Sequence, residues 1–134
     1  MKTLIVVDMQ NDFIDGALAN PAAAAIVEPM AEYIKNFKGQ VIFTRDTHDH
    51  DYLKTQEGRN LPIEHCMRGT EGWEINDTLF EAVKNSSSIW AVVDKDCFGD
   101  IYEVSNELEP DVNEIYLCGT CTDICVISVA LNLK

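Results

Sequence analysis

Short runs of apolar residues, many of them β-branched, alternate along this chain with stretches that place apolar residues at helical spacing. A short unbroken apolar run is typical of a strand that is buried on both faces of a sheet. Such runs lie at Leu4–Val7, Val41–Phe43, Ile89–Val93 and Ile115–Cys118. Because strands separated by helices join in parallel through right-handed crossovers, the pattern predicts a three-layer α/β fold, a doubly wound parallel sheet with helices on both faces.

Helical patterns occupy the segments between these runs. The clearest one begins at Pro21 and is ended by Gly39. A weaker pattern covers Ile75–Val83, a short one covers Ile101–Leu108, and the last begins at about Asp123. The segments therefore supply the helices that a doubly wound sheet requires.

Length and charge limit the classes of function. The 134 residues suffice for a single core, so we expect one domain over the whole chain. A formal net charge of −13 without a basic patch excludes nucleic acid as a partner. No apolar run approaches the roughly 20 residues of a membrane helix, and the first residues do not form a signal peptide. These features, with an odd number of cysteines, predict a cytoplasmic protein without a disulfide framework.

Three reactive side chains are predicted to lie at one edge of the sheet. Asp8 and Lys95 stand at the carboxyl ends of the first and third predicted strands, where parallel sheets bind their ligands. Cys125 lies in the first turn of the last predicted helix, where the helix dipole and free N–H groups lower the pKa of a thiol. As base, cation and nucleophile, the three form a set that can carry out acyl transfer without histidine.

Each of these residues also has an ordinary structural interpretation. Asp8 could be a turn residue, Lys95 a solvated charge, and Cys125 a small buried hydrophobic residue. Cys118, Cys121 and Cys125 together could suggest a metal knuckle, but zinc sites of that kind pair two clusters and the sequence has no second one.

A long polar loop from Asp46 to about Gly72 carries a second set of chemical groups. Connections of that length without a helical or strand period are uncommon and usually functional. Its candidate metal ligands are Asp46, His48, Glu57 and His65. Carboxylates and imidazoles without a thiolate suit zinc, iron or manganese. His50 and Glu64 lie in the same loop as further groups of these types.

Three motifs follow one another in a definite order along the chain. They are VDMQNDF at Val7–Phe13, Lys95 followed by Phe98-Gly99, and LCGTCTDICV at Leu117–Val126. In order and spacing they resemble the motifs of the isochorismatase-like cysteine hydrolases, and the resemblance covers essentially the whole chain. It implies a Rossmann-like fold and a hydrolase.

The resemblance also implies a role for each motif residue. Asp8 would take the proton of Cys125 and later give it to the leaving amine, and Lys95 would hold Asp8. Thr120 and Cys121 match the position of a non-proline cis peptide, which would direct the Cys121 N–H and the Cys125 N–H at the oxyanion.

Within that superfamily, the polar loop is similar to that of nicotinamidases and pyrazinamidases. Leu61–Cys66 and Gly69–Gly72 carry this likeness. The implied ligands of a divalent metal, zinc before iron or manganese, are Asp46, His48 and His65, with Glu57 added in some members. The implied substrate is nicotinamide, with its ring nitrogen on the metal and its carboxamide at Cys125. Phe13 and Trp73 could pack on the ring, although each is otherwise a core residue.

This sequence departs from the family pattern in two respects. Thr47 and Asp49 stand where a tryptophan and a proline are frequent. The family also continues with further strands and helices beyond Lys134, so we expect a chain that lacks its C-terminal strands and exposes an apolar sheet edge at the fourth strand. The resemblance implies a homo-oligomer, and such an edge favours association.

Four other functions remain open at this level. A related hydrolase could act on a carbamoyl or ureido amide, or on isochorismate, although isochorismate hydrolysis would need neither the metal ligands nor the nucleophile. A non-catalytic scaffold of the same fold would not need Asp8, Lys95 and Cys125 together. A redox protein could use Cys121 and Cys125 instead.

Overall fold

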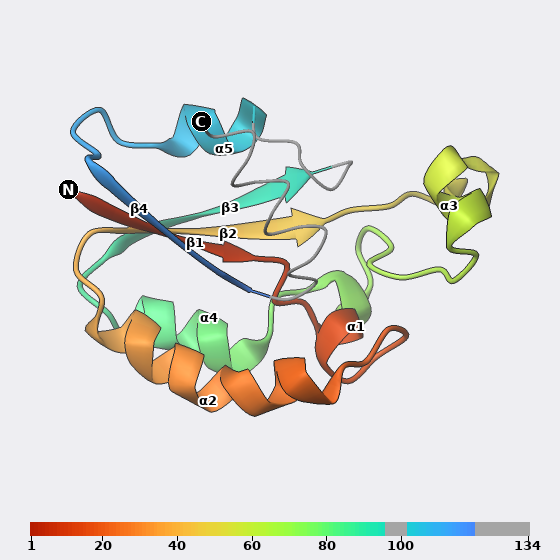
Figure 1. Ribbon diagram of the computed structural model, residues 1–134, viewed down its shortest axis with the longest axis horizontal. Coiled ribbons are helices and arrows are strands. Elements are labelled where there is room, and N and C mark those ends of the chain that lie inside the picture. Colours follow the sequence, from red (N-terminus) through yellow and green to blue (C-terminus); the bar gives the residue numbers. More distant parts are fainter. Residues whose placement is uncertain (96–101, 120–134) are drawn as a thin grey trace.

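Four parallel strands form the centre of the protein (Figure 1). The computed structural model describes residues 1–95 and 102–119. The strands are β1 (Lys2–Val7), β2 (Gln40–Asp46), β3 (Ile89–Lys95) and β4 (Glu114–Gly119), in the spatial order β3-β2-β1-β4. Every neighbouring pair is parallel, so the predicted α/β fold class and all four predicted strands are confirmed.

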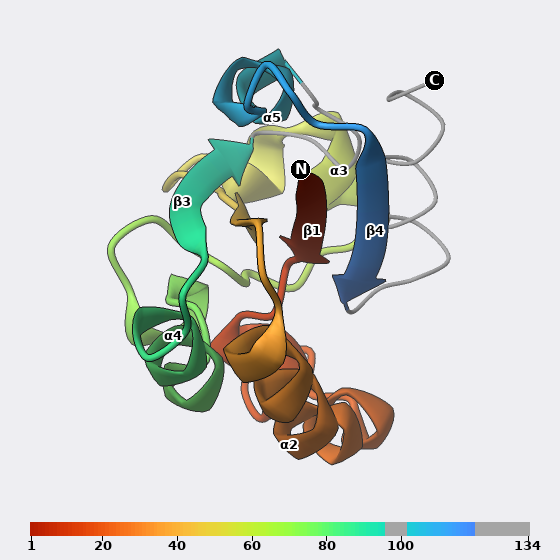
Figure 2. The ribbon, with the colours of Figure 1, turned by 90° about the vertical axis from the view of Figure 1, so that its left-hand side faces the viewer.

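Helices cover both faces of this sheet, as the doubly wound prediction requires. α2 (Pro21–Asn36) and α4 (Asp77–Lys84) lie against one face, and α5 (Tyr102–Glu107) lies against the other (Figure 2). Among the described residues, no helix has the length and apolar character that crossing a bilayer demands.

The helix boundaries follow from local capping. The Asn20 side chain accepts a hydrogen bond from the Ala22 N–H, and Pro21 occupies the first helical turn of α2. The predicted end at Gly39 was wrong by three residues, because Phe37 already has extended backbone angles and buries its ring. Gly39 instead takes a φ of 150° at the entry to β2, where a Cβ atom would lie 2.2 Å from the Lys2 carbonyl oxygen.

The weak helical pattern at 75–83 corresponds to α4, shifted by one or two residues. Asn76 caps α4 by accepting a hydrogen bond from the Leu79 N–H. Ile75 therefore remains outside the helix, where it forms an isolated antiparallel bridge with Gln10.

The core divides into two clusters because β1 and β2 are buried on both faces. Leu4 and Val6 point into the larger cluster, beneath α2 and α4. Ile5 and Val7 point into the smaller one, beneath α5. This alternation explains why the central strands read as continuous apolar runs in the sequence.

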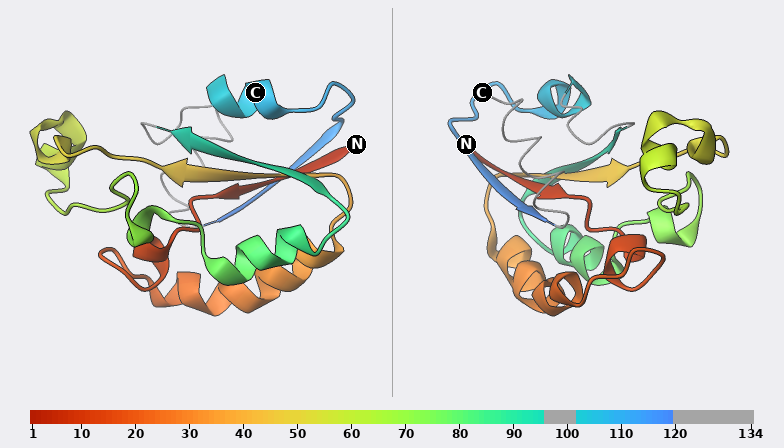
Figure 3. Two further views of the ribbon diagram at one scale, coloured as in Figure 1. Left: turned by 180° about the vertical axis from the view of Figure 1, so that it is seen from behind. Right: turned by 45° about the vertical axis from the view of Figure 1, so that its right-hand side comes forward.

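Four short helices were not predicted from the sequence. They are α1 (Asn11–Ile14), η1 (Tyr52–Lys54), α3 (Gln56–Asn60) and η2 (Glu71–Trp73). Segments of three to five residues are too short to show a helical period. α3 begins at a Thr55 cap that accepts a hydrogen bond from the Gly58 N–H, and it lies beyond the carboxyl end of β2 (Figure 3).

β4 forms one edge of the described sheet. Ile115 and Tyr116 on this strand are exposed. At its carboxyl end, Gly119 has a φ of 147°, and a Cβ atom there would lie 2.1 Å from the Val7 carbonyl oxygen. The helix predicted from about Asp123 lies outside the described residues.

Candidate active site and metal centre

A buried ion pair joins the ends of two strands that are not neighbours in the sheet. Asp8 follows β1, Lys95 is the last residue of β3, and β2 lies between these strands. The Lys95 Nζ donates a hydrogen bond to the Asp8 Oδ2 at 2.8 Å, and neither side chain is exposed. The structure thus brings together two of the three residues that the sequence predicted to act together.

The backbone at Asp8 adopts an unusual conformation. Its φ of 53° lies in the left-handed region, which costs a residue other than glycine about 1–3 kcal/mol and is most frequent at functional sites. Hydrogen bonds to Thr44 hold this turn in place. The Asp8 N–H donates to the Thr44 carbonyl at 3.2 Å, and the Thr44 Oγ1 donates to the Asp8 Oδ1 at 2.7 Å. Both carboxylate oxygens of Asp8 therefore accept a hydrogen bond.

Folding alone does not explain such a pair. Removing a carboxylate and an ammonium from water costs more free energy than their attraction usually returns, and apolar replacements are often neutral or stabilising. The Asp8–Lys95 pair is therefore better explained by chemistry at this end of the sheet than by stability.

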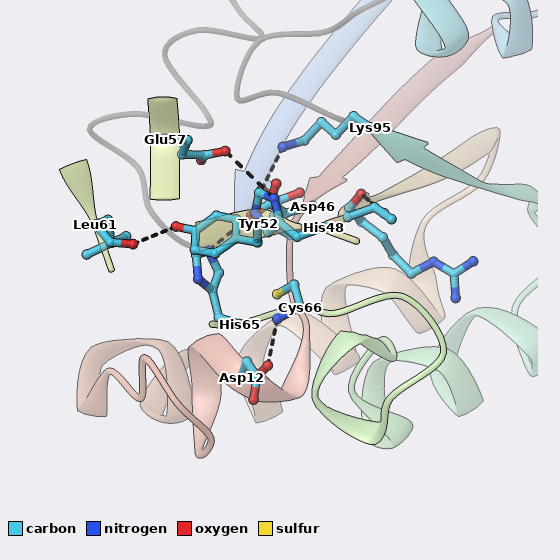
Figure 4. Close-up of polar contacts among 12 residues, drawn as sticks. Asp12, Asp46, His48, Tyr52, Glu57, Leu61, His65, Cys66 and Lys95 are labelled. Carbon is cyan, nitrogen blue, oxygen red and sulfur yellow. Dashed lines mark hydrogen bonds and ion pairs between the residues drawn. The ribbon is translucent and has the colours of Figure 1, made fainter. Parts of the chain in front are cut away.

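Three side chains of the polar loop converge next to this pair (Figure 4). Asp46 is the last residue of β2, His48 follows two residues later, and His65 comes from the segment after α3. One potential ligand atom of each lies within 4.8 Å of the others, and all three residues are buried. The Asp46 Oδ2 lies 2.9 Å from the His48 Nε2 and 3.4 Å from the His65 Nε2.

The polar atoms of this cluster fit a divalent metal ion. The His65 Nδ1 donates to the Ile63 carbonyl at 2.7 Å, so Nε2 is the ring nitrogen that faces Asp46, at 3.4 Å. Among residues 1–95 and 102–119, the Asp46 Oδ1 and the Glu57 Oε1 are buried without a hydrogen-bond partner. Imidazole nitrogens and carboxylate oxygens that converge in a buried site can hold a divalent cation.

The carboxylates and imidazoles of the cluster shift one another's pKa values. Burial alone would raise the pKa of Asp46, but hydrogen bonds with His48 and His65 and the charge of Lys95 lower that pKa well below its usual range. Burial and the charge of Asp46 raise the pKa of Glu57. For His65, burial opposes the charged form, but the hydrogen bonds to Asp46 and to a backbone carbonyl raise its pKa.

The remaining predicted site residues lie around this cluster. The Glu57 Oε2 is 3.7 Å from the His48 Nδ1, so Glu57 is next to the cluster rather than within it. The Phe13 ring meets the His65 ring edge to face, with 5.6 Å between centroids. The Trp73 ring stacks under the Arg45 guanidinium at 3.7 Å, and its N–H donates to the Thr47 hydroxyl.

Sequence reasoning missed three residues that support the site. Tyr52 packs its ring against His48 and His65, at 4.4 and 5.2 Å between centroids, and donates its hydroxyl to the Leu61 carbonyl. Thr44 and Gln10 hold Asp8 and Asp46 through hydrogen bonds. Only Gln10 lies in a recognised motif, and Tyr52 and Thr44 carry no chemical signal in the sequence.

The predicted nucleophile Cys125 lies outside the described residues, as do Thr120 and Cys121. Two other cysteines are described, Cys66 and Cys118. Burial raises the pKa of the Cys118 thiol to about 12. Cys118 is therefore almost entirely protonated at neutral pH and is poorly suited to attack a carbonyl.

Comparison with known proteins identifies the family. A family model described as the isochorismatase domain matches residues 2–134. This chain belongs to the isochorismatase family. A nicotinamidase/pyrazinamidase crystal structure from Bacillus subtilis is similar at 32% identity and a TM-score of 0.72, over 98% of this chain and 77% of that chain. The fold prediction and the family resemblance are thereby confirmed.

Two further solved structures bear on the chemistry of the site. A pyrazinamidase of Pyrococcus horikoshii in complex with zinc is 30% identical, with a TM-score of 0.72 over 98% of this chain and 76% of that chain. An N-carbamoylsarcosine amidase from Thermoplasma acidophilum is 27% identical, with a TM-score of 0.73 over 98% and 74%. The chain is thus an isochorismatase-family hydrolase with a candidate divalent-metal site at Asp46, His48 and His65.

The Asp8–Lys95 pair should show strong energetic coupling. We expect Lys95→Met to lower the free energy of unfolding by about 3–5 kcal/mol, because Asp8 then stays buried without the ammonium that neutralises it. Asp8→Asn in the same chain should recover part of that loss, since no net charge remains buried. Urea unfolding of both single variants and the double variant measures the coupling. Strictly additive losses would contradict the ion pair as described.

The metal centre should depend on the buried histidines and not on their exposed neighbour. We expect one Zn²⁺ per chain in the wild type, and a loss of affinity of more than about 100-fold in His65→Ala, since even residues outside the ligand set are worth about 10–100-fold. His50→Ala, an exposed histidine of the same loop, is the matched control and should bind normally. Calorimetric titration of each protein with Zn²⁺ measures the affinity and the number of ions bound. Equal binding by His65→Ala and the wild type would contradict the site.

Proposed function

We propose that this chain hydrolyses nicotinamide to nicotinate and ammonia through a thioester on Cys125. The observation that carries the proposal is the buried Asp8–Lys95 pair, which lies beside a metal-type cluster of Asp46, His48 and His65. Similarity to a nicotinamidase/pyrazinamidase and to a pyrazinamidase in complex with zinc supports this substrate class.

In the first half of the proposed reaction, Cys125 is acylated. The Asp8 carboxylate takes the thiol proton as the sulfur attacks the amide carbon. The tetrahedral intermediate then collapses, the C–N bond breaks, and Asp8 gives its proton to the departing nitrogen, which leaves as ammonia. Lys95, which donates to the Asp8 Oδ2 at 2.8 Å, keeps this carboxylate ionised and oriented between transfers.

In the second half, water hydrolyses the thioester. Asp8 takes a proton from the water as the water oxygen attacks the acyl carbon. The C–S bond then breaks, Asp8 gives that proton to the sulfur to restore the Cys125 thiol, and the acid leaves as nicotinate after it loses its remaining proton to solvent. The backbone N–H groups of Cys121 and Cys125 are the proposed donors to the oxyanion in both halves. The Asp8–Lys95 pair thus serves both steps with the same carboxylate.

The cluster next to this pair would bind and orient the substrate. Asp46, His48 and His65 would hold a divalent metal, for which we propose zinc, with Glu57 beside His48 as a further acidic group. A metal bound there would supply a Lewis acid for the pyridine nitrogen of nicotinamide. Phe13, whose ring packs on His65, would border the aromatic ring of the substrate.

A carbamoyl amide is the second candidate substrate. The similarity to an N-carbamoylsarcosine amidase favours it, and the same proton transfers by Asp8 would apply. The two substrates differ in their demands on the metal cluster, because a carbamoyl amide of that kind has no ring nitrogen to bind.

Ammonia release from nicotinamide by zinc-loaded protein tests the proposal. We expect release by the wild type, none above background with Cys125→Ala, and a decrease in kcat of about 10²–10⁴-fold with Asp8→Asn, the usual contribution of a general acid and base. Cys118→Ala, which removes a buried thiol of high pKa, is the matched control and should remain active.

Two results would contradict parts of this proposal. Undiminished release by Cys125→Ala would exclude the thioester. The wild type could instead fold and bind zinc, release no ammonia from nicotinamide, and release ammonia from a carbamoyl amide. That result would make the carbamoyl amide the substrate and would leave the proposed mechanism unchanged.

A further inference from the structure

Gln10 is a fully buried amide that the proposed chemistry does not use. Its Oε1 accepts a hydrogen bond from the Asp46 N–H at 2.9 Å, and its Nε2 donates to the Asp46 carbonyl at 2.9 Å. The same Nε2 donates to the Trp73 carbonyl at 2.8 Å. We propose that Gln10 is a positioning residue that fixes the metal ligand Asp46. Its side-chain amide makes the hydrogen bonds to the Asp46 backbone that a further residue of β1 would otherwise make. The inference rests on the metal centre proposed above.

The need for a substitute arises where β1 stops pairing with β2. The register of the two strands ends at Val7 and Thr44, because the chain turns away at Asp8 with a φ of 53°. Asp46 lies two residues beyond Thr44, so its backbone N–H and carbonyl also face the β1 side of the sheet. β1 has no residue opposite them.

The side chain of Gln10 supplies what the missing strand residue would have supplied. An amide has one carbonyl and an N–H donor in a plane, as a peptide unit does. On the other side of β2, the Thr47 N–H donates to the Lys95 carbonyl at 2.9 Å, which is an ordinary contact between backbones. The end of β2 is thus held on one side at Asp46, which carries the proposed metal-binding carboxylate, and on the other side at Thr47, the next residue.

Gln10 is itself held firmly by its neighbours in the chain. The Asn76 N–H donates to the Met9 carbonyl at 2.9 Å, and the Asn11 N–H donates to the Glu74 carbonyl at 3.1 Å. These bonds fix the backbone on either side of Gln10 against the segment that precedes α4. Because Gln10 follows Asp8 by two residues, it also ties the metal ligand Asp46 to the turn that carries the catalytic carboxylate.

A purely structural role is the competing explanation, and Gln40 provides a matched control for it. Gln40 is buried at the opposite end of the same strand β2. Its Oε1 accepts hydrogen bonds from the Thr3 hydroxyl and the Glu109 N–H, and its Nε2 donates to the Glu107 carbonyl. Gln40 thus resembles Gln10 in burial, strand and number of hydrogen bonds, but it lies far from the metal ligands along the strand.

The experiment compares Gln10→Met with Gln40→Met in the otherwise unchanged chain. Zn²⁺ affinity is measured by competition with a chromogenic chelator, and the visible spectrum of bound Co²⁺ reports the ligand geometry. Urea unfolding of the metal-free proteins measures the structural cost. We expect both variants to lose stability, but only Gln10→Met to bind Zn²⁺ about 10–100-fold more weakly and to change the Co²⁺ spectrum.

Equal Zn²⁺ affinity and an unchanged Co²⁺ spectrum in folded Gln10→Met would overturn the inference, and so would equal losses of affinity in both variants. If Gln10→Met does not fold, the comparison of Gln10→Asn with Gln40→Asn decides, since each keeps the amide on a shorter side chain. Failure of both Gln10 variants to fold would assign Gln10 a structural role and overturn the inference. A wild type that binds no Zn²⁺ would instead refute the metal centre of the proposed function.

Discussion

The buried hydrogen-bonded ion pair between Asp8 and Lys95 is the interaction on which the rest of the site depends. It reaches across β2 and joins the carboxyl ends of β1 and β3, so it requires the parallel sheet to be assembled before it can form. It also requires the left-handed turn at Asp8, which the hydrogen bonds to Thr44 stabilise. Burying a carboxylate and an ammonium together costs free energy unless both groups form hydrogen bonds. At this end of the sheet, Asp8 accepts hydrogen bonds from Thr44 and Lys95.

The metal cluster shares its supports with this pair. Asp46 and Lys95 are register partners at the ends of β2 and β3, and the charge of Lys95 is one of the causes of the low pKa of Asp46. Gln10 connects the Asp8 turn to Asp46 from the other side. The proposed proton-transfer group and the proposed substrate-orienting group are therefore positioned by the same few strand ends, which suits a reaction that must hold one small amide between them.

The sequence predicted the parts of this structure that depend on regular patterns. Continuous apolar runs located all four strands, and the ends of those strands predicted the meeting of Asp8 with Lys95. The short helices of the polar loop escaped prediction because no period exists over so few residues. Tyr52 and Gln10 also escaped, since their roles come from contacts with residues far along the chain. Gln10 lies in a recognised motif, but the motif does not indicate those contacts. Asp46, His48 and His65 were predicted from the residue types in the polar loop and then from the family resemblance, and the folded loop brings them together.

Direct detection of the acyl group tests the central claim that the buried pair drives covalent catalysis. Zinc-loaded protein is mixed with nicotinamide, quenched in acid within the first turnover, digested and examined by mass spectrometry. The account predicts a nicotinoyl group on Cys125 in the wild type, and much slower formation of that group in Asp8→Asn. Ammonia release without an acyl group on any cysteine would contradict it, as would an acyl group that forms equally fast in Asp8→Asn.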